Sequence, residues 1–554
     1  MPLSPRPPRS PARPSTRREF LTNTSLAVAG TVLGARRLKA GLPVRIPADS
    51  PQAADVFLEG IAGGIDMKAL AQRAIDTAKQ GGADYADIRV SERHTLRLFP
   101  PAINNVALQT EFTFGIRALV DGVWGFSYGR APDGDNIAQY TRDAVSAARL
   151  AAKLGAAAPV RDWAPPPPAT GEWTVPIEID PFTVPIQQQA ELINAVDTTV
   201  QRIPGSMGSF ETEWVRETRV CASTTGTLIS QQLYRAYPRY QAAARYGLNY
   251  MPLRVPGFHW KSAGYELYAM PGLMDKFKEA TEEATWFARL PMRALDVGRY
   301  PVALDGAIMG SVLITLLSQS LELDRVMGME VDASGTSRMT PDLLGTTIMS
   351  PLVTVNAHRN APSVTAVKWD DEGGLAQEHT VIRNGVLVDY HTSSETLPAL
   401  KSWYQKENVP LRSNGCAGAI EARKPVSIHP PQLVMTPSKS KASLEELYKD
   451  MKKGIVVMRE AWITTDQQLA SGAIGWGQMY EVSQGKIVRR LKDMQLQFNT
   501  LPFLKGITAI GDATTVQDQD VSTSKGLPWV STPAGATAPA ALFKEVNAVS
   551  IQMT

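Results

Sequence analysis

The sequence contains few residues of the kinds that bind a metal or form a disulfide framework. Among its 554 residues there are only 2 cysteines and 6 histidines. Cys221 and Cys416 lie far apart and form no Cys-x-x-Cys motif, which excludes a disulfide scaffold and favours two buried thiols over a single bridge. None of the histidines pairs at helical spacing or neighbours a cysteine in the sequence: His94, His259, His358, His379, His391 and His429.

The chain also lacks an excess of charge of either sign. It has 57 Lys and Arg against 54 Asp and Glu, a formal net charge of +3 at pH 7. This balance gives no support for a nucleic-acid-binding protein or for a polybasic membrane anchor. Hydrophobic residues make up 44% and charged residues 20%, so a chain of this length can bury the cores of two or three domains.

The apolar run near the N-terminus is too short for a comfortable membrane span, so no stable span is expected. It follows a pair of arginines, Arg17 and Arg18, and then Phe20 and Leu21. This order resembles a twin-arginine export signal. Residues 1–45 are interpreted as that signal with a disordered N-terminus, and the protein is expected in the periplasm or cell envelope. The alternative is an ordinary disordered basic N-terminus.

The first half of the chain alternates helical patterns with strand patterns. Residues 66–80 place apolar side chains at helical spacing, and a Gly-Gly pair ends the pattern. Residues 112–128 are typical of a hairpin, because Asp121 and Gly122 tolerate the positive φ of its turn. Strands are also expected at 85–99 and 210–246, and helices at 135–154, 187–202 and 273–288. This order predicts an α+β fold, with an N-terminal domain over residues 46–295.

The second half is dominated by short strands with turn residues between them, which predicts a β-rich domain over residues 296–554. Residues 381–390 and 482–491 each indicate a hairpin. Residues 309–325 instead predict one central buried helix, and residues 443–454 a second helix. The central helix has an apolar face formed by Val312, Leu313, Leu316, Leu317 and Leu321.

Six stretches between residue 82 and residue 457 share their order and spacing with one family. They read GADYADIRVSE, FGIRALVDGVWGFSYG, GRYPVALDGAIMGSVL, LELDRVMG, WDDEGGLAQEHTVIRNGVLVDY and SLEELYKDMKKGIVV. Together they resemble the TldD/PmbA (TldD/TldE) metallopeptidases, once called modulators of DNA gyrase. The resemblance runs from about Asp66 to the end of the chain.

The resemblance implies a zinc site in the active subunit of that family. A His-Glu-x-x-x-His helix and a cysteine near the C-terminus hold the ion there, and the Glu takes a proton from bound water. Alignment on LELDR puts the family's His, Glu and His on Ile314, Thr315 and Gln319, and its cysteine within residues 516–528, which contain none. The sequence therefore predicts a degenerate metal site without a cofactor. Zinc is expected only if the chain is an active enzyme after all.

Five acidic residues are further candidates for a cleft. Glu322 and Asp324 can be read as carboxylate ligands, although a helix end packed by Arg325 is favoured. Asp370, Asp371 and Glu372 either bind substrate or order a turn at the mouth of the cleft, and both interpretations stay open. A replacement metal site assembled from distant segments also stays open.

The expected function follows from the resemblance and from the missing ligands. The chain is interpreted as a metal-less subunit or peptide-binding scaffold of a peptidase complex. It would form a homodimer or a heterodimer with a TldD/PmbA-family subunit and bind unfolded peptide. The alternative is an active metallopeptidase with an atypical metal site. A hydrolase with non-metal chemistry would need a set of catalytic residues that the sequence does not show.

Overall fold

A long, mostly antiparallel sheet organises the first half of the chain. The computed structural model describes residues 44–46 and 65–551, with gaps at 102–104, 156–159, 161–162, 164, 247–248, 255–257, 330–335, 420, 476 and 526–529. The proposed signal residues Arg17, Arg18, Phe20 and Leu21 lie outside the described residues. Within the described part, no helix is long and apolar enough to cross a membrane.

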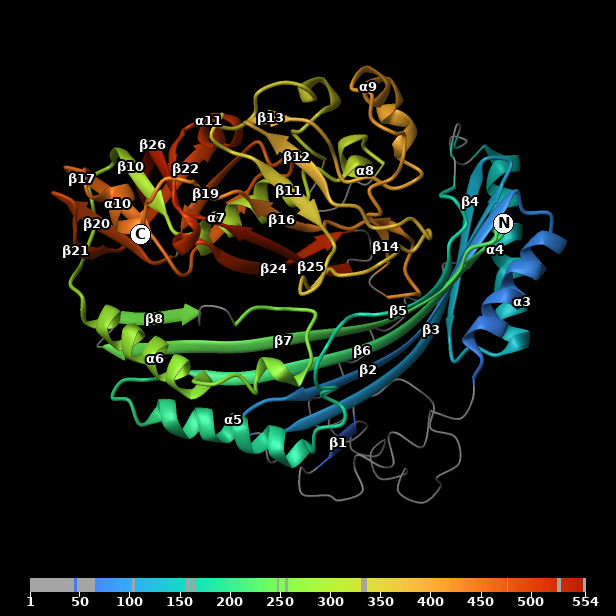
Figure 1. Ribbon diagram of the computed structural model, residues 1–554, viewed down its shortest axis with the longest axis horizontal. Helices are drawn as coiled ribbons and strands as arrows, with labels where there is room; N and C mark the ends of the chain where they lie inside the picture. Colours follow the sequence, from blue (N-terminus) through green and yellow to red (C-terminus); the bar gives the residue numbers. More distant parts are fainter. Residues whose placement is uncertain are drawn as a thin grey trace, which may run out of the picture. The chain divides into compact units, whose positions relative to one another are not determined.

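The long sheet has eight strands in the order β1-β3-β2-β6-β7-β5, with β4 paired to β3 and β8 paired to β7. Figure 1 shows β2, β3, β6 and β7 running side by side along its length. Its strands are β1 Val44–Ile46, β2 Tyr85–Leu98, β3 Val106–Val120, β4 Val123–Arg130, β5 Thr170–Thr174, β6 Ser209–Ser223, β7 Leu228–Tyr246 and β8 Asn249–Arg254.

Four helices cover the apolar face of this sheet. They are α3 Met67–Gln80, α4 Gly134–Leu154, α5 Ile186–Gln201 and α6 Leu273–Arg289. α3 and α4 pack at one end of the sheet, against β2, β3 and β4, whereas α5 and α6 pack towards the other end, against β6, β7 and β8 (Figure 1). The strand and helix positions expected for the first half are therefore confirmed.

Turn chemistry explains why the predicted hairpins form. Asp121 and Gly122 connect β3 to β4 with φ of 52° and 76°. Asn384 and Gly385 connect two later strands with φ of 48° and 79°. Positive φ at both central residues suits the twist of an antiparallel pair, and glycine and asparagine reach it at low cost.

The second half contains two larger sheets. The ten-stranded sheet has the order β18-β19-β22-β26-β10-β17-β20-β21-β9, with β23 beside β26, and the six-stranded sheet has the order β13-β12-β11-β16-β25-β24. The first comprises β9 Met292–Arg293, β10 Gly298–Leu304, β17 Lys453–Val457, β18 Trp462–Thr465, β19 Ser471–Gly475, β20 Met479–Ser483, β21 Lys486–Leu491, β22 Met494–Asn499, β23 Ile507–Ile510 and β26 Ala541–Ser550. The second comprises β11 Val355–His358, β12 His379–Arg383, β13 Val386–Leu387, β16 Gln432–Met435, β24 Gln517–Lys525 and β25 Val530–Ala538.

Helices are few and short in this half. α7 packs against β24 and β25 of the six-stranded sheet, and β14 and β15 form a separate two-stranded ladder. These elements are α7 Gly306–Leu313, α8 Leu323–Val326, α9 Lys401–Lys406, α10 Leu444–Tyr448, α11 Thr500–Lys505, β14 Ala417–Gly418 and β15 Ser427–Ile428. The mixed α+β fold with a β-rich second half is as the sequence predicts.

Two helix predictions in this half were wrong in extent. The helix expected over residues 443–454 ends at Tyr448, because Lys453–Val457 forms strand β17, whose Ile455–Val457 segment pairs in parallel with β10. The helix expected over residues 309–325 is interrupted. α7 leads into a π-helical turn over Ile314–Ser318, and the chain then extends at Glu322, whose backbone bridges that of His391. Pairing with distant segments overrides local helix propensity in both places.

Candidate functional site

The positions aligned with the family's metal motif follow α7, at the core of the second half. The apolar face predicted for this segment is confirmed, because all five of its residues are fully buried. Gly306 at the start of α7 permits the close packing, since a Cβ there would lie 2.5 Å from the carbonyl oxygens of Thr515 and Ala538. The π-helical turn that follows is a rare feature that often occurs at functional sites.

The three motif positions contact the protein itself. Ile314 is 1% exposed within the apolar core, and Thr315 is half-buried. Gln319 reaches the C-terminal strand β24, where its side-chain amide Nε2 donates to the carbonyl of Ser524 at 3.0 Å. The structure therefore brings Gln319 next to the stretch where the family's cysteine would be. These residues do not fit a zinc ion, because Ile314 has no lone pair and amide or hydroxyl oxygens are poor zinc ligands.

A buried lysine lies beside this motif. The Lys525 ammonium donates to Glu322 Oε2 at 2.9 Å, to Asp324 Oδ2 at 2.8 Å and to the Ile428 carbonyl at 2.8 Å. Lys525 is 4% exposed, and the two acids are 1% and 7% exposed. Both predicted carboxylates thus bind an internal cation. Sequence reasoning missed this lysine, because its acidic partners lie 201 and 203 positions away in the chain.

Electrostatics of the buried cluster keep Lys525 charged. Burial alone lowers the pKa of Lys525, but Asp324 and Glu322 outweigh it and raise that pKa above its ordinary value. Burial raises the pKa of Glu322 to about 7, against the opposing effect of Lys525 and Arg325. Asp324 also accepts the backbone amides of Arg325 and Ile428, at 2.8 and 3.0 Å. The sequence favoured a helix end at which Arg325 packs against Glu322 and Asp324. That interpretation omitted Lys525, which is the main cationic partner of both acids.

Two histidines approach each other close to this cluster. His391 Nδ1 lies 3.5 Å from His379 Nε2, and burial lowers the pKa of both imidazoles. Among the described residues, no group of three or more His, Cys, Asp or Glu side chains is placed to hold a metal ion. Both cysteines are unpaired and buried, as the sequence favours.

The acidic run that begins at Asp370 forms a turn against the long sheet. Asp370 accepts the backbone amides of Glu372, Gly374 and Ala417 at 3.0, 2.7 and 3.2 Å. Burial, together with the charge of Glu372, raises the pKa of Asp370. This residue therefore has the turn-ordering role that the sequence left open.

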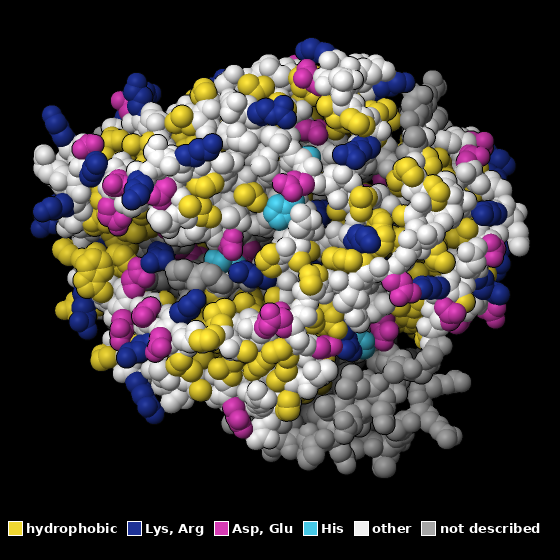
Figure 2. Space-filling model, in the orientation of Figure 1, with side chains coloured by type: hydrophobic (Ala, Val, Ile, Leu, Met, Phe, Trp, Pro, Cys, Tyr) yellow, Lys and Arg dark blue, Asp and Glu magenta, His cyan; other side chains and the backbone are white. Residues whose placement is uncertain are grey.

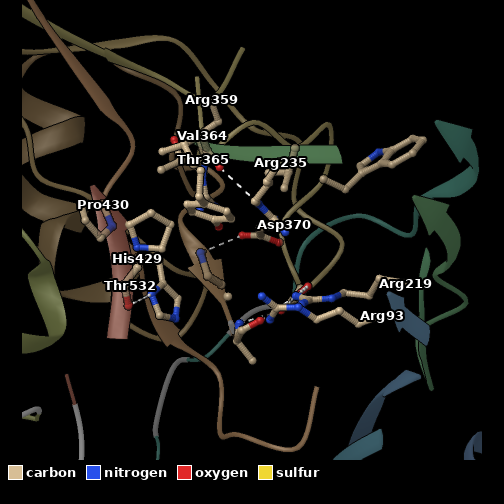
Figure 3. A pocket seen from close by; sticks show the side chains of 18 residues that line it. Arg93, Arg219, Arg235, Arg359, Val364, Thr365, Asp370, His429, Pro430 and Thr532 are labelled. Atoms are coloured by element: carbon tan, nitrogen blue, oxygen red, sulfur yellow. Dashed lines mark hydrogen bonds and ion pairs between the residues drawn. The ribbon is translucent and has the colours of Figure 1, made fainter. Parts of the chain in front are cut away.

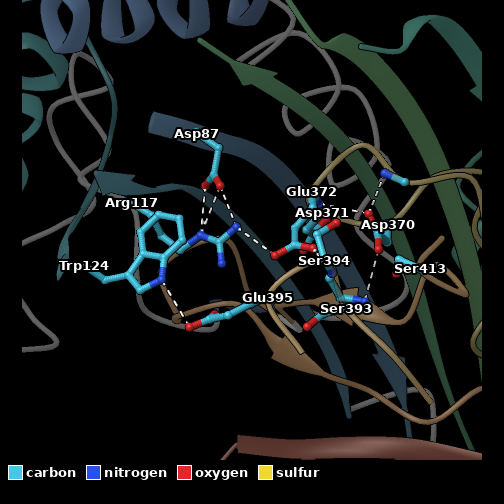
Figure 4. A network of polar contacts seen from close by, with 12 residues as sticks. Asp87, Arg117, Trp124, Asp370, Asp371, Glu372, Ser393, Ser394, Glu395 and Ser413 are labelled. Carbon is cyan, nitrogen blue, oxygen red and sulfur yellow. Dashed lines mark hydrogen bonds and ion pairs between the residues drawn. The ribbon is translucent and has the colours of Figure 1, made fainter. Parts of the chain in front are cut away.

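The next two acids join the two halves of the chain. Asp371 Oδ2 accepts Arg219 Nη1 of β6 at 2.8 Å, and Glu372 Oε1 accepts Arg117 Nη2 of β3 at 3.3 Å. Figure 4 shows Arg117 between Asp87 and Glu372, with Trp124 beside it. All three acids of the run are at least 95% buried. Asp371 and Glu372 therefore hold the turn against the sheet through ion pairs that local sequence does not reveal.

Comparison with known proteins finds a family that the second half resembles. Residues 297–550 match a family model described as the PmbA/TldA metallopeptidase C-terminal domain. The match supports the PmbA/TldD family.

Two metalloproteases are similar to this PmbA/TldD-like chain in sequence. The protein from Methanocaldococcus jannaschii is 23% identical over 437 residues, which are 77% of this chain and 89% of that protein. The protein from Methanothermobacter thermautotrophicus is 22% identical over 444 residues, 77% and 88% of the two chains.

Solved structures share the fold. A protein described as a modulator of a DNA gyrase from Thermotoga maritima aligns with a TM-score of 0.64 and 16% identity. TldE from Thermococcus kodakarensis aligns with a TM-score of 0.64 and 13% identity. Each alignment covers 87% of this chain and 100% of the other. At these identities the likeness shows the fold alone, and the PmbA/TldD-like fold thus extends over both halves of the chain.

Proposed function

We propose that this chain is a metal-less, peptide-binding subunit of a PmbA/TldD-type peptidase complex. The observation that supports the proposal most directly is the pair of contacts beside the motif. Gln319 is hydrogen-bonded to Ser524, and the Lys525 ammonium binds the two nearest carboxylates. The ammonium group of Lys525 therefore already occupies the position between the two carboxylates. A divalent metal ion there would be repelled by this positive charge.

Peptide binding is supported by the edge of the six-stranded sheet. Among the described strands, β24 pairs with β25 alone and is the outermost strand of its sheet. An outermost strand offers backbone donors and acceptors to an extended peptide, which can add to the sheet as a further strand. Acidic and basic side chains are interspersed over the face shown in Figure 2.

The isolated chain is expected to bind no stoichiometric zinc and to cleave no peptide. Zinc addition or chelation should leave its thermal midpoint unchanged, since a ligand at one hundred times its dissociation constant would stabilise the native state by about 2.7 kcal/mol. Metal analysis of the purified protein and melting curves with and without chelator test this. Near-stoichiometric zinc together with chelator-sensitive cleavage would instead establish the alternative, an active metallopeptidase with an atypical site.

Association with a second subunit is part of the same proposal. A homodimer, or a heterodimer with a PmbA/TldD-family partner, is expected to bury about 1,600 Å² or more in total, as stable protein interfaces do. Light scattering at micromolar concentration and a native pull-down measure it. A monomer in the first experiment with no partner in the second would contradict the association.

Export through the twin-arginine route completes the proposal and rests on Arg17, Arg18, Phe20 and Leu21. Cell fractionation is expected to find the full chain outside the cytoplasm and the variant with Arg17→Lys and Arg18→Lys retained inside. The lysine variant keeps the charge and is therefore a strict control for the arginine pair itself. An equal distribution of the two forms would exclude this route.

A further inference from the structure

A small cavity lies between the long sheet and the loops of the second half. Its volume is about 70 Å³. The sheet contributes Arg93 of β2, Arg219 of β6 and Arg235 of β7, while the second half contributes Arg359 and Asp370 (Figure 3). A buried water needs roughly 10–15 Å³ measured in this way, so the cavity has room for a planar oxyanion group but not for a large side chain.

Two of the four guanidinium groups are already paired with acids. Arg219 binds Asp371 at 2.8 Å and Glu217 at 2.9 Å, and Arg235 binds Glu217 at 3.3 Å. Burial raises the pKa of Glu217, but Arg219, Arg235 and Arg93 outweigh it and hold that pKa at about 2, so Glu217 is ionised. The Arg219–Asp371 pair joins the sheet to the loop, whereas the Glu217 pairs lie within the sheet. Together they provide acidic partners for Arg219 and Arg235 without any ligand.

Arg93 and Arg359 have fewer hydrogen-bond partners among the described residues than Arg219 and Arg235. The Nε–H groups of both are buried and have no hydrogen-bond partner within the part of the chain that the structure describes. Arg359 donates through Nη1 to the Gly415 carbonyl at 3.0 Å, whereas no ion pair of Arg93 lies within 4 Å among the described residues. A buried donor without an acceptor costs free energy, and a guanidinium N–H more than most. Both donors belong to side chains that line one cavity.

The charge around the cavity is mostly positive. Four guanidinium groups line it together with the carboxyl groups of Asp370 and Asp371, and Glu217 binds Arg219 and Arg235 from within the sheet. The neighbouring ionic clusters are paired among themselves. Arg89 and Arg117 are matched by Asp87 and Glu372, and Lys525 and Arg325 by Glu322 and Asp324. A cavity lined mainly by guanidinium groups suits a small oxyanion.

We propose that this cavity binds the carboxylate group of a ligand, with Arg93 and Arg359 as its donors. The inference rests on the proposed function, in which the ligand is a peptide and the carboxylate its C-terminus; a free small carboxylic acid offers the same chemistry. A guanidinium presents paired N–H donors in a planar fork that matches a carboxylate, so two such groups can fix the end of a peptide chain in one orientation.

Isothermal titration of the full chain tests the proposal with four probes. They are N-acetyl-trialanine with a free carboxyl group, the same peptide with a C-terminal amide, acetate and inorganic phosphate. We expect the acid peptide to bind about tenfold or more tightly than the amide, as loss of a charge-assisted hydrogen bond implies. Arg93→Gln should weaken the acid peptide by about tenfold and leave the amide unchanged. Arg97→Gln, four residues further along β2 and outside the cavity, is the matched control and should behave as wild type.

Each outcome decides the proposal. Equal binding of acid and amide overturns it while peptide binding as such survives, and phosphate binding as tight as the acid peptide overturns the choice of a carboxylate. No binding of any probe also overturns it, and the zinc content measured separately then shows whether the metal-less proposal fails as well. Acetate that binds as tightly as the acid peptide identifies a free carboxylic acid as the ligand. The acid–amide comparison uses wild-type protein, so the test stands even if Arg93→Gln does not fold.

Discussion

Replacement of Lys525 by methionine is expected to lower the free energy of unfolding by about 3–5 kcal/mol, the usual cost of removing one partner from a buried ion cluster. The methionine fills a similar volume but leaves the carboxylates of Glu322 and Asp324 buried without their cation. Urea denaturation followed by circular dichroism measures the change. A loss below about 1 kcal/mol would show that the cluster is solvated or uncharged in the native protein.

Two further variants separate the charge effect from packing. Lys486→Ala removes an exposed lysine from β21 and should change stability by no more than about 0.5 kcal/mol. The triple variant Lys525→Met, Glu322→Gln and Asp324→Asn removes the charges together. It should recover much of the lost stability, because replacing a complete buried ion cluster by uncharged groups costs far less than breaking it.

Acidification from pH 7 to about pH 4.5 is expected to lower the free energy of unfolding by about 2.5 kcal/mol through His429 alone. His429 is 5% exposed, and its Nδ1 lies 3.2 Å from the Thr532 hydroxyl. Burial, reinforced by the charges of Lys525 and Arg359, lowers the pKa of His429 to about 3, while Asp324 opposes and Arg219 adds to the effect. The native imidazole therefore stays neutral where the unfolded chain takes up a proton.

The direction of this effect follows from proton uptake in the two states. Above a pH of roughly 6.5 neither state holds the extra proton and the stability is fully present; it is lost as the pH falls towards 3. Glu322 acts in the opposite direction between about pH 4.5 and 7, because its native pKa is raised to about 7. The comparison of wild type with His429→Gln in urea at several pH values isolates the histidine. Parallel pH profiles of the two proteins would contradict the expectation.

Local patterns determined most of the elements of this protein. The alternation of β2 is an example, because Ile88 and Val90 face the helices while Asp87, Arg89 and Ser91 point to the other side. Turn residues such as Asp121 and Gly122 placed the hairpins for a reason that depends only on neighbouring φ angles. The extent of the helices in the second half did not follow in this way, since pairing with remote strands ended them.

The missing histidines at positions 314 and 319 were visible in the sequence by itself, and so was the absence of cysteine from residues 516–528. The contact that Gln319 makes instead with Ser524 was not visible there. A polar strand face normally indicates solvent, yet Asp87, Arg89 and Ser91 are at most 2% exposed. Arg117, which binds Asp87, also binds Glu372 of the loop that begins at Asp370.

The sequence therefore determined the strands, the turns and the family resemblance, all of which depend on residues close together in the chain or on their order. Only the tertiary structure decided that Lys525 binds Glu322 and Asp324, and that Arg93 and Arg359 line one cavity. Their partners lie hundreds of positions away, and the free energy of a buried charge depends on which groups surround it in space rather than on its neighbours in the chain.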